Sequence, residues 1–401
     1  SSVLGDDTDI DGDALTISSI RTGDIAATNG AQGAVGSILA GTYGVLTLNE
    51  DGQYSYATTA SAVDGLAAGV TAVDVFTYTI TDGAASTSAE LLITVTGVND
   101  APVAVDNTSS VLENGSIDLA ASLSVLGDDT DVDGDALTIS SIRTGDIAAT
   151  NGAQGAVGSI LAGTYGVLTL NEDGQYSYAT TASAVDGLAA GVTVVDVFTY
   201  TITDGAESTS AELLITVTGV NDAPVAVGNT SSVLENGSID LAAASSVLGD
   251  DTDIDGDALT ISSIRTGDIA ATNGAQGAVG SILAGTYGVL TLNEDGQYSY
   301  ATTASAVDGL AAGVTAVDVF TYTITDGAAS TSAELLITVT GVNDAPVAVD
   351  NTSSVLENGS IDLAASLSVL GDDTDVDGDA LTISSIRTGD IAATNGAQGA
   401  V

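Results

Sequence analysis

Five residue types are missing from this sequence: cysteine, histidine, lysine, methionine and tryptophan. Without cysteine there can be no disulfide and no thiolate nucleophile, and without histidine or lysine there is no imidazole base and no Schiff-base amine. The lack of cysteine leaves the redox compartment open, although it suits an exported chain that must not crosslink while unfolded. These absences argue against an enzyme.

Positive charge is also scarce, with 4 Lys and Arg residues against 54 Asp and Glu and a formal net charge of −50. Nucleic acid is therefore excluded as a partner. The chain is 44% hydrophobic, which indicates a globular rather than a disordered protein. Because uncompensated charge disfavours a compact state, we expect a divalent cation among the carboxylates. No stretch is apolar enough to predict a membrane span in this segment.

The sequence repeats itself with a period of 122 residues, which places Gly5, Gly127, Gly249 and Gly371 in register. The copies differ at a few positions that alternate, so that residues 1–157 recur unchanged as 245–401. This pattern indicates duplication of a two-repeat block. It favours a role that adds length over catalysis.

The three prolines mark the predicted domain boundaries, because each lies in the string GVNDAPVAV and proline interrupts strand pairing. Cutting there predicts a partial repeat at 1–98 that lacks its first strands and two complete repeats at 99–220 and 221–342. It also predicts a partial repeat at 343–401 with N-terminal strands only. We expect neither end to be a natural terminus.

Short runs rich in Val, Ile, Thr, Tyr and Phe alternate with Gly, Asn and Asp clusters, which predicts an all-β fold. In the second repeat the clearest strands are Ala136–Arg143, Val167–Leu170 and Gln175–Tyr178, then two alternating runs at Phe198–Ile202 and Leu213–Val217. Weaker strands are expected at Val103–Val105, Ser116–Leu119 and Ala156–Leu161, and a helical turn within Thr181–Val192. About seven strands per repeat indicate an Ig-like β-sandwich.

The motif with the clearest chemistry is GDDTDVDGD, in which carboxylates alternate on a loop that contains glycine. Hard oxygen ligands at this density suit Ca²⁺, and no soft ligand competes. The motif lacks the closing Glu of an EF-hand, because Ser140 takes that position, and it lies between strands. A solvated acidic loop is the alternative, but close carboxylates repel one another strongly without a cation.

Two further elements recur with the same period: an Asn-Asp pair before each proline, and a Glu in the string VLENGS. Taken alone, the pair could form a turn and the Glu could serve solubility. Together with the acidic loops they give the following candidate metal ligands: Asp7, Asp9, Asp11, Asp13, Asn99, Asp100, Glu113, Asp129, Asp131, Asp133, Asp135, Asn221, Asp222, Glu235, Asp251, Asp253, Asp255, Asp257, Asn343, Asp344, Glu357, Asp373, Asp375, Asp377 and Asp379.

Three stretches of the second repeat, TDGAESTSAELLITVTGVNDAPVAV, GVLTLNEDGQYSYAT and LGDDTDVDGDALTI, resemble the cadherin-like, VCBS-type repeats of large bacterial RTX adhesins. The resemblance covers essentially the whole chain. It implies tandem β-sandwich domains arranged as an extended rod, outside the cell or on a bacterial surface. It also implies calcium between successive domains, held by a Glu near the first strand, an Asx linker and an Asp-x-Asp loop of the following domain.

Carried onto this sequence, the resemblance implies two ligand sets. One combines Glu113 with Asn221, Asp222, Asp251 and Asp253, and the preceding one combines Asn99, Asp100, Asp129 and Asp131, while Asp133 and Asp135 could close either shell. No equivalent of the mid-domain acidic motif of cadherins is evident. Arg143, the only cation of its repeat, is expected to form a structural salt bridge.

The function that these features favour is a calcium-stiffened stalk that projects a distal binding domain, with calcium and further repeats of the same chain as partners. Assembly of like chains into an extracellular filament is one alternative. Multivalent carbohydrate or surface binding by each repeat is another. A glycosidase with paired carboxylates is disfavoured, because near-identical copies recur every 122 residues.

Overall fold

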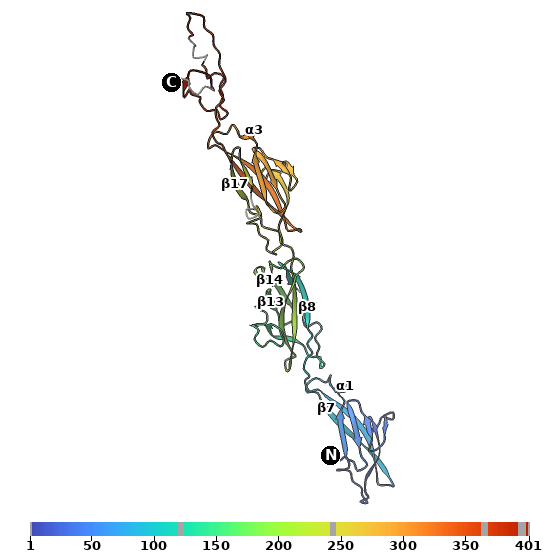
Figure 1. Cartoon of the computed structure of the whole chain (residues 1–401). Helices are drawn as coiled ribbons and strands as arrows, with labels where there is room; N and C mark the ends of the chain where they lie inside the picture. The colour runs from blue at the N-terminus through green and yellow to red at the C-terminus, as the bar shows by residue number, and fades with distance from the viewer. Residues whose placement is uncertain (1, 119–123, 241–245, 362–367, 392–397, 400–401) are drawn as a thin grey trace. The chain divides into compact units, whose positions relative to one another are not determined.

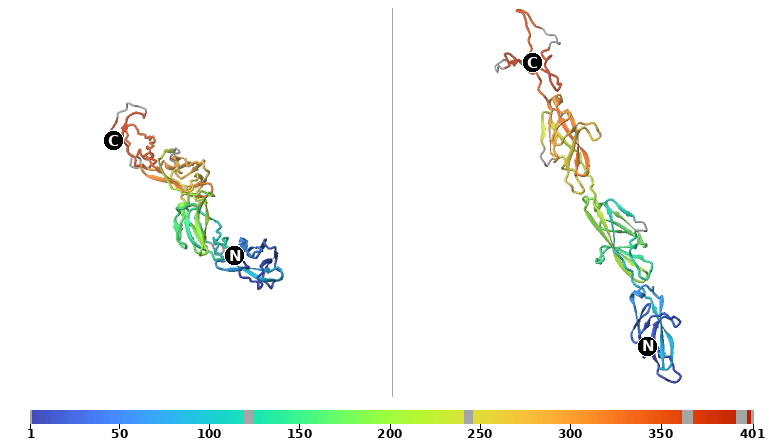
Figure 2. Two further views of the ribbon diagram at one scale, coloured as in Figure 1. Left: turned by 90° about the horizontal axis from the view of Figure 1, so that it is seen from below. Right: turned by 90° about the vertical axis from the view of Figure 1, so that its right-hand side faces the viewer.

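The Thr-, Val- and Tyr-rich runs form β-sheets, because alternate side chains of a strand point to opposite faces and one face can be buried. The computed structural model describes residues 2–118, 124–240, 246–361, 368–391 and 398–399. The chain divides into two units, Ser1–Gly219 and Val220–Val401. The first unit contains two β-sandwiches, and the second contains one sandwich followed by an acidic segment (Figures 1 and 2).

The first repeat consists of two sheets with the strand orders β2-β1-β6-β7 and β3-β4-β5. Its elements are β1 (Thr16–Thr22), β2 (Gln32–Gly33), β3 (Ile38–Ala40), β4 (Gly44–Leu48), β5 (Tyr54–Thr58), α1 (Ala60–Val63), β6 (Thr71–Thr81) and β7 (Ser86–Thr96).

The second repeat has one further strand in each sheet, so that the orders are β11-β10-β15-β16-β8 and β12-β13-β14-β9. Its elements are β8 (Asn107–Leu112), β9 (Ser116–Asp118), β10 (Thr138–Thr144), β11 (Gln154–Gly155), β12 (Ile160–Ala162), β13 (Gly166–Leu170), β14 (Tyr176–Thr180), α2 (Ala182–Val185), β15 (Thr193–Thr203) and β16 (Ser208–Thr218). Strand β8 pairs with β16 in parallel, and the other pairings are antiparallel.

The third repeat reproduces this topology within the second unit. Its elements are β17 (Asn229–Leu234), β18 (Ser238–Asp240), β19 (Thr260–Thr266), β20 (Gln276–Gly277), β21 (Ile282–Ala284), β22 (Gly288–Leu292), β23 (Tyr298–Thr302), α3 (Ala304–Val307), β24 (Thr315–Thr325) and β25 (Ser330–Thr340), and the following segment pairs β26 (Ile386–Arg387) with β27 (Gln398–Gly399). None of the helices described is long and apolar enough to cross a membrane.

The core of the second repeat lies between its two sheets and is built around buried aromatic rings. Tyr178 and Phe198 meet edge to face with ring centroids 6.4 Å apart. The Tyr178 hydroxyl donates to the carboxylate of Asp196 at 2.7 Å, and Asp196 is only 3% exposed. This carboxylate also accepts the backbone N–H groups of Thr164, Tyr165 and Gly166, so it fixes the turn between β12 and β13.

The all-β prediction is confirmed, and the predicted helical turn within Thr181–Val192 is present as α2. The second repeat has nine strands rather than about seven. The strand expected at Ala156–Leu161 is interrupted by a turn at Gly158, whose φ is +76°. Val103–Val105 contributes only an isolated bridge to Thr130, and Leu119 lies outside the described residues.

Candidate metal centre

The acidic loops at 129–135, 251–257 and 373–379 are each attached to the linker that precedes them. In the second repeat Thr130 exchanges two backbone hydrogen bonds with Val103, at 2.8 and 3.1 Å. One oxygen of Asp129 accepts the backbone N–H of Val105 at 2.7 Å. Burial raises the pKa of Asp129, the Val105 hydrogen bond opposes the rise, and Asp128 adds a smaller one. Asp129 therefore fastens the loop to the linker, as Asp251 and Asp373 do in their repeats.

The alternate aspartates that follow form a compact cluster. Oδ1 of Asp131 accepts the N–H groups of Asp133 and Asp135 at 2.9 and 3.2 Å, which bends the loop back on itself. Gly134 has a φ of +80°, a backbone conformation that glycine adopts without strain. One oxygen of each of the three carboxylates lies within 4.8 Å of the others, and the same holds for the clusters Asp253, Asp255, Asp257 and Asp375, Asp377, Asp379.

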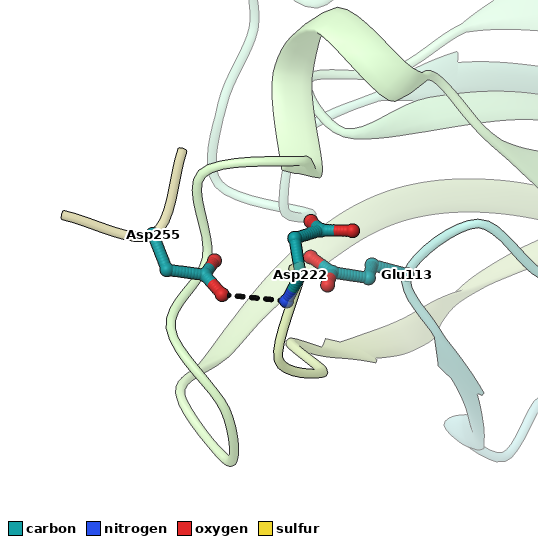
Figure 3. Close-up of side chains that lie close together, drawn as sticks. All are labelled: Glu113, Asp222 and Asp255. Atoms are coloured by element: carbon teal, nitrogen blue, oxygen red, sulfur yellow. Dashed lines mark hydrogen bonds between the residues drawn. The ribbon is translucent and has the colours of Figure 1, made fainter. Parts of the chain in front are cut away.

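The linker is bound to the middle aspartate of each cluster. The backbone N–H of Asp222 donates to Oδ2 of Asp255 at 2.8 Å, as the dashed line in Figure 3 shows, and Asp100 and Asp344 make the equivalent bonds to Asp133 and Asp377. The other oxygen of Asp255 is buried and has no hydrogen-bond partner among the described residues, as in the equivalent Asp133 and Asp377. Each of these loops thus contains a buried carboxylate oxygen that could accept a metal ion.

The linker asparagine has a structural role of its own. The side-chain amide of Asn99 donates to the carbonyl of Asp100 at 3.0 Å and to the carboxylate of Asp204 at 2.8 Å. The hydrogen bond from Asn99 is the largest cause of the lowered pKa of Asp204. Asn221 repeats both bonds with Asp222 and Asp326. The amide groups of these asparagines therefore hold the linker against its own repeat.

The second unit shows how a buried glutamate joins this cluster. Glu235 follows β17, where its N–H continues the pairing with β25 by donating to Thr340 O at 2.9 Å. The residue is 3% exposed. The amide of Val342 lies close enough to lower the pKa of the carboxyl, but its geometry falls short of a hydrogen bond, and neither carboxylate oxygen has a partner in the described part of this unit.

Three aspartates face this glutamate. The pKa of Glu235 is raised, chiefly by burial and then by Asp344, Asp377 and Asp308. These residues come from the linker, from the acidic loop of the following repeat and from the turn after α3. Each of the three aspartates also has one buried oxygen that lacks a hydrogen-bond partner among the described residues. Carboxylates from four segments thus lie near one another, and each has an oxygen without a hydrogen-bond partner among the described residues.

Asp308 is a member of this centre that the sequence analysis missed. It follows the helical turn of α3, whose end packs against the next acidic loop: a Cβ on Gly309 would lie 3.6 Å from the carbonyl oxygen of Val376. The equivalent contact of the first unit joins Gly65 to Val132 at 3.5 Å. The available signal was the recurrence of SAVDG at Asp64, Asp186 and Asp308 with the period of the repeat.

Of the other predicted ligands, Glu113 and the first acidic loop match their equivalents in later repeats, whereas Glu357 does not. Glu113 occupies the position of Glu235 in its own repeat, 3% exposed after β8, with its N–H donating to Thr218 O at 2.8 Å. In the first repeat Asp9 accepts the N–H groups of Asp11 and Asp13, so this loop has the same turn as the others. Glu357 is exposed, and the structure does not place it in an acidic cluster.

Arg143, which was expected to form a salt bridge, makes a different set of contacts. The guanidinium of Arg143 donates to backbone carbonyls, those of Ile147 at 3.0 Å and of Ala149. Backbone carbonyls suit this planar donor because it carries five N–H groups. Arg143 therefore folds the loop between β10 and β11 around itself instead of neutralising a carboxylate.

Comparison with known proteins settles the family. The model of the bacterial cadherin-like domain matches residues 1–97, 99–219 and 221–341, and that of a bacterial Ig domain matches residues 343–401. The chain belongs to the bacterial cadherin-like domain family. This membership confirms the resemblance inferred from the sequence.

Among curated proteins, this cadherin-like chain is similar to the calcium-binding lectin RapA2 of Rhizobium johnstonii, with 32% identity over 45% of the chain and 74% of the relative. Among solved structures it matches Drosophila N-cadherin EC1-4 with 13% identity, 84% and 70% coverage and a TM-score of 0.29. It also spans 39% of the endo-fucoidan hydrolase MfFcnA4, with 81% of the chain covered, 18% identity and a TM-score of 0.20.

The cadherin-like repeats offer a coherent set of hard ligands. Ca²⁺ takes six to eight oxygens at roughly 2.3 to 2.6 Å from carboxylates, carbonyls and water. The buried, unpartnered oxygens of Glu235, Asp308, Asp344 and Asp377 have the chemistry of such a site. No thiolate or imidazole competes, since the sequence contains neither cysteine nor histidine. The residues present therefore fit calcium.

Proposed function

We propose that this chain is an extender stalk of a secreted or cell-surface bacterial adhesin, stiffened by calcium at the junctions between its repeats. In this account each β-sandwich is a rigid unit, and the ion restricts bending at the linker so that the array forms a rod and projects a distal binding domain. The supporting observation is Glu235, which is buried, has no hydrogen-bond partner among the described residues, and lies near three aspartates whose charges raise its pKa.

Electrostatics explains why a cation would stiffen such a junction. Without an ion the buried carboxylates repel one another and favour separation of the segments that carry them. A cation that coordinates Glu235, Asp308, Asp344 and Asp377 would tie one sandwich to its linker and to the next acidic loop. By the period of 122 residues, Glu113 and Asp186 are the equivalents of Glu235 and Asp308.

Calcium would also couple the stalk to its location. Binding energy from a site that exists only in the folded state is folding energy. Low calcium inside a cell would therefore leave the repeats weakly folded for export, and high calcium outside would fold and stiffen them.

The test is the thermal unfolding of the full chain with calcium and with chelator, by scanning calorimetry. An ion at 100 times its Kd adds about 2.7 kcal/mol, which for a domain of this size raises Tm by about 10 °C. The double variant Glu113→Gln, Glu235→Gln should lose most of this shift. The matched control Glu172→Gln, Glu294→Gln changes exposed glutamates on hairpin tips and should keep it. An unchanged Tm in calcium, or equal shifts in both variants, would contradict the proposal.

A second candidate function is multivalent carbohydrate binding by the repeats. Its support is the similarity to a protein named as a calcium-binding lectin, at 32% identity. The two functions are compatible, because a stalk that also binds saccharide through each repeat gains avidity from every copy. Binding of the full chain to a glycan array, with stoichiometry measured per chain, tests it.

A further inference from the structure

Each cadherin-like repeat contains a cleft that is separate from the acidic loops. In the second repeat its volume is about 460 Å³, and the equivalent clefts measure about 480 Å³ in the first repeat and 410 Å³ in the third. The walls are the loop between β10 and β11, the turn between β12 and β13, and the start of β15. The size falls within the range of small-molecule sites.

The outer wall of the cleft is held in place by charged side chains. Arg143 binds the carbonyls of Ile147 and Ala149, and the carboxylate of Asp146 accepts the N–H of Ala149 at 2.7 Å. From the neighbouring strand, Glu212 accepts the N–H of Ile147 at 2.7 Å. The only cation of the repeat thus shapes a loop whose Ile147 side chain is 48% exposed. Such a wall is preorganised before any ligand arrives.

The floor of the cleft is equally fixed. Asp196 accepts four hydrogen bonds there, from three backbone N–H groups and from Tyr178. A Cβ at Gly163 would lie 2.5 Å from Asp196 Oδ2, and one at Gly152 would lie 1.8 Å from the carbonyl oxygen of Thr144. Glycine is therefore required at both positions, and the space beside them stays open.

Most of the polar groups that remain available are uncharged, and the charged exception is Asp146, one oxygen of which accepts the N–H of Ala149. The side-chain amide of Asn151 and the hydroxyl of Thr164 line the cleft, are exposed, and make no hydrogen bond within the described part of the chain. The carboxylate of Asp196 already accepts four hydrogen bonds, and the single further carboxylate of the lining, Asp146, supplies too few oxygens for a metal. No cation lines the cleft to bind an anion, and the net charge of −50 repels acidic ligands.

We propose that this cleft binds one or two units of a neutral saccharide, so that the array presents a sugar site in every repeat. Amide and hydroxyl groups together donate to and accept from sugar hydroxyls. The spacing of 122 residues repeats the site along the chain. The inference rests on the second candidate function, carbohydrate binding, and gives it a location that shares no residue with the proposed calcium ligands.

The test is calorimetric titration of the full chain, in calcium, with four neutral disaccharides: maltose, cellobiose, lactose and mannobiose. The triple variant Ala40→Leu, Ala162→Leu, Ala284→Leu fills each cleft from an exposed wall position, so the fold is retained, which an unchanged Tm verifies. Asn29→Ala, Asn151→Ala removes the amide that lines the clefts of the first two repeats. The control Ser37→Ala, Ser159→Ala, Ser281→Ala changes exposed hydroxyls outside the clefts.

The proposal predicts binding of at least one disaccharide at about three sites per chain, an affinity about tenfold lower at the first two of these sites in the asparagine variant, and loss of binding in the leucine variant. The serine control should bind like the parent. No binding of any of the four sugars overturns the inference. Equal binding by the leucine variant would contradict the assignment of the sugar site to this cleft, but it would leave carbohydrate binding by the chain established.

Discussion

Tyr178 offers a sharp test of what holds each sandwich together. Its hydroxyl donates to Asp196 at 2.7 Å, and both side chains are nearly inaccessible to solvent, at 1% and 3% exposure. Tyr178→Phe removes one hydrogen bond to a charged acceptor, which costs about 1.5 to 3 kcal/mol. Three backbone donors continue to satisfy the carboxylate, so the lower end of that range applies, about 1.5 kcal/mol.

The assay is urea unfolding of the full chain with the substitution made in all repeats, as Tyr56→Phe, Tyr178→Phe and Tyr300→Phe, followed by circular dichroism. With a slope of about 1.5 kcal/mol/M, a loss of about 1.5 kcal/mol in each repeat lowers the midpoint by about 1 M. The matched control is Tyr43→Phe, Tyr165→Phe, Tyr287→Phe, because these partly buried hydroxyls make no hydrogen bond among the described residues. Equal midpoints for the two triple variants would refute the reasoning.

Three further predictions concern pH, loop order and packing. Burial is the largest single effect on Asp74, but the hydrogen bonds from Tyr56 and from the N–H groups of residues 42–44 together outweigh it and lower the pKa of Asp74 below its usual 3.8. The stabilisation by the charged carboxylate is therefore complete above pH 3.8 and is lost as the pH falls through the lowered folded-state pKa. Unfolding of Asp74→Asn and of the parent from about pH 7 to 2 should show a difference in stability that disappears only in acid. Arg143→Gln should raise hydrogen exchange in residues 145–152 about tenfold by mass spectrometry, and unchanged exchange would contradict the role of the guanidinium. Gly163→Ala should cost about 1 to 3 kcal/mol in urea unfolding, since its Cβ would meet Asp196 Oδ2 at 2.5 Å, and a neutral result would show that the floor can yield.

The strands with strict alternation were predictable from sequence, and the weakly patterned ones were not. The runs at Phe198–Ile202 and Leu213–Val217 lie within β15 and β16, because a period of two is a local property. Strand β8 was missed since NTSSVL is short and pairs in parallel with β16, about a hundred residues later in the chain. Such a pairing depends on a nonlocal contact that local alternation does not reveal.

The acidic loops and the glutamates stand out in the sequence because they recur with the repeat, but the different contacts of the individual aspartates are not evident from it. Asp129 looked equivalent to Asp131, yet one of its oxygens is bonded to Val105, a fact that depends on how the linker crosses the loop. Asp308 recurs with the repeat in the string SAVDG, but nothing in the sequence connects that string with Glu235, which lies near Asp308 in the fold. Arg143 reached carbonyls because its loop wraps around the guanidinium.

The central claim is that calcium stiffens the junctions between repeats, and small-angle scattering of the full chain during a calcium titration tests it most directly. The account predicts that the maximum particle dimension and the radius of gyration rise together to those of a rod as calcium saturates, and that Glu113→Gln, Glu235→Gln stays compact or flexible. A scattering profile that does not change between chelator and saturating calcium would contradict it.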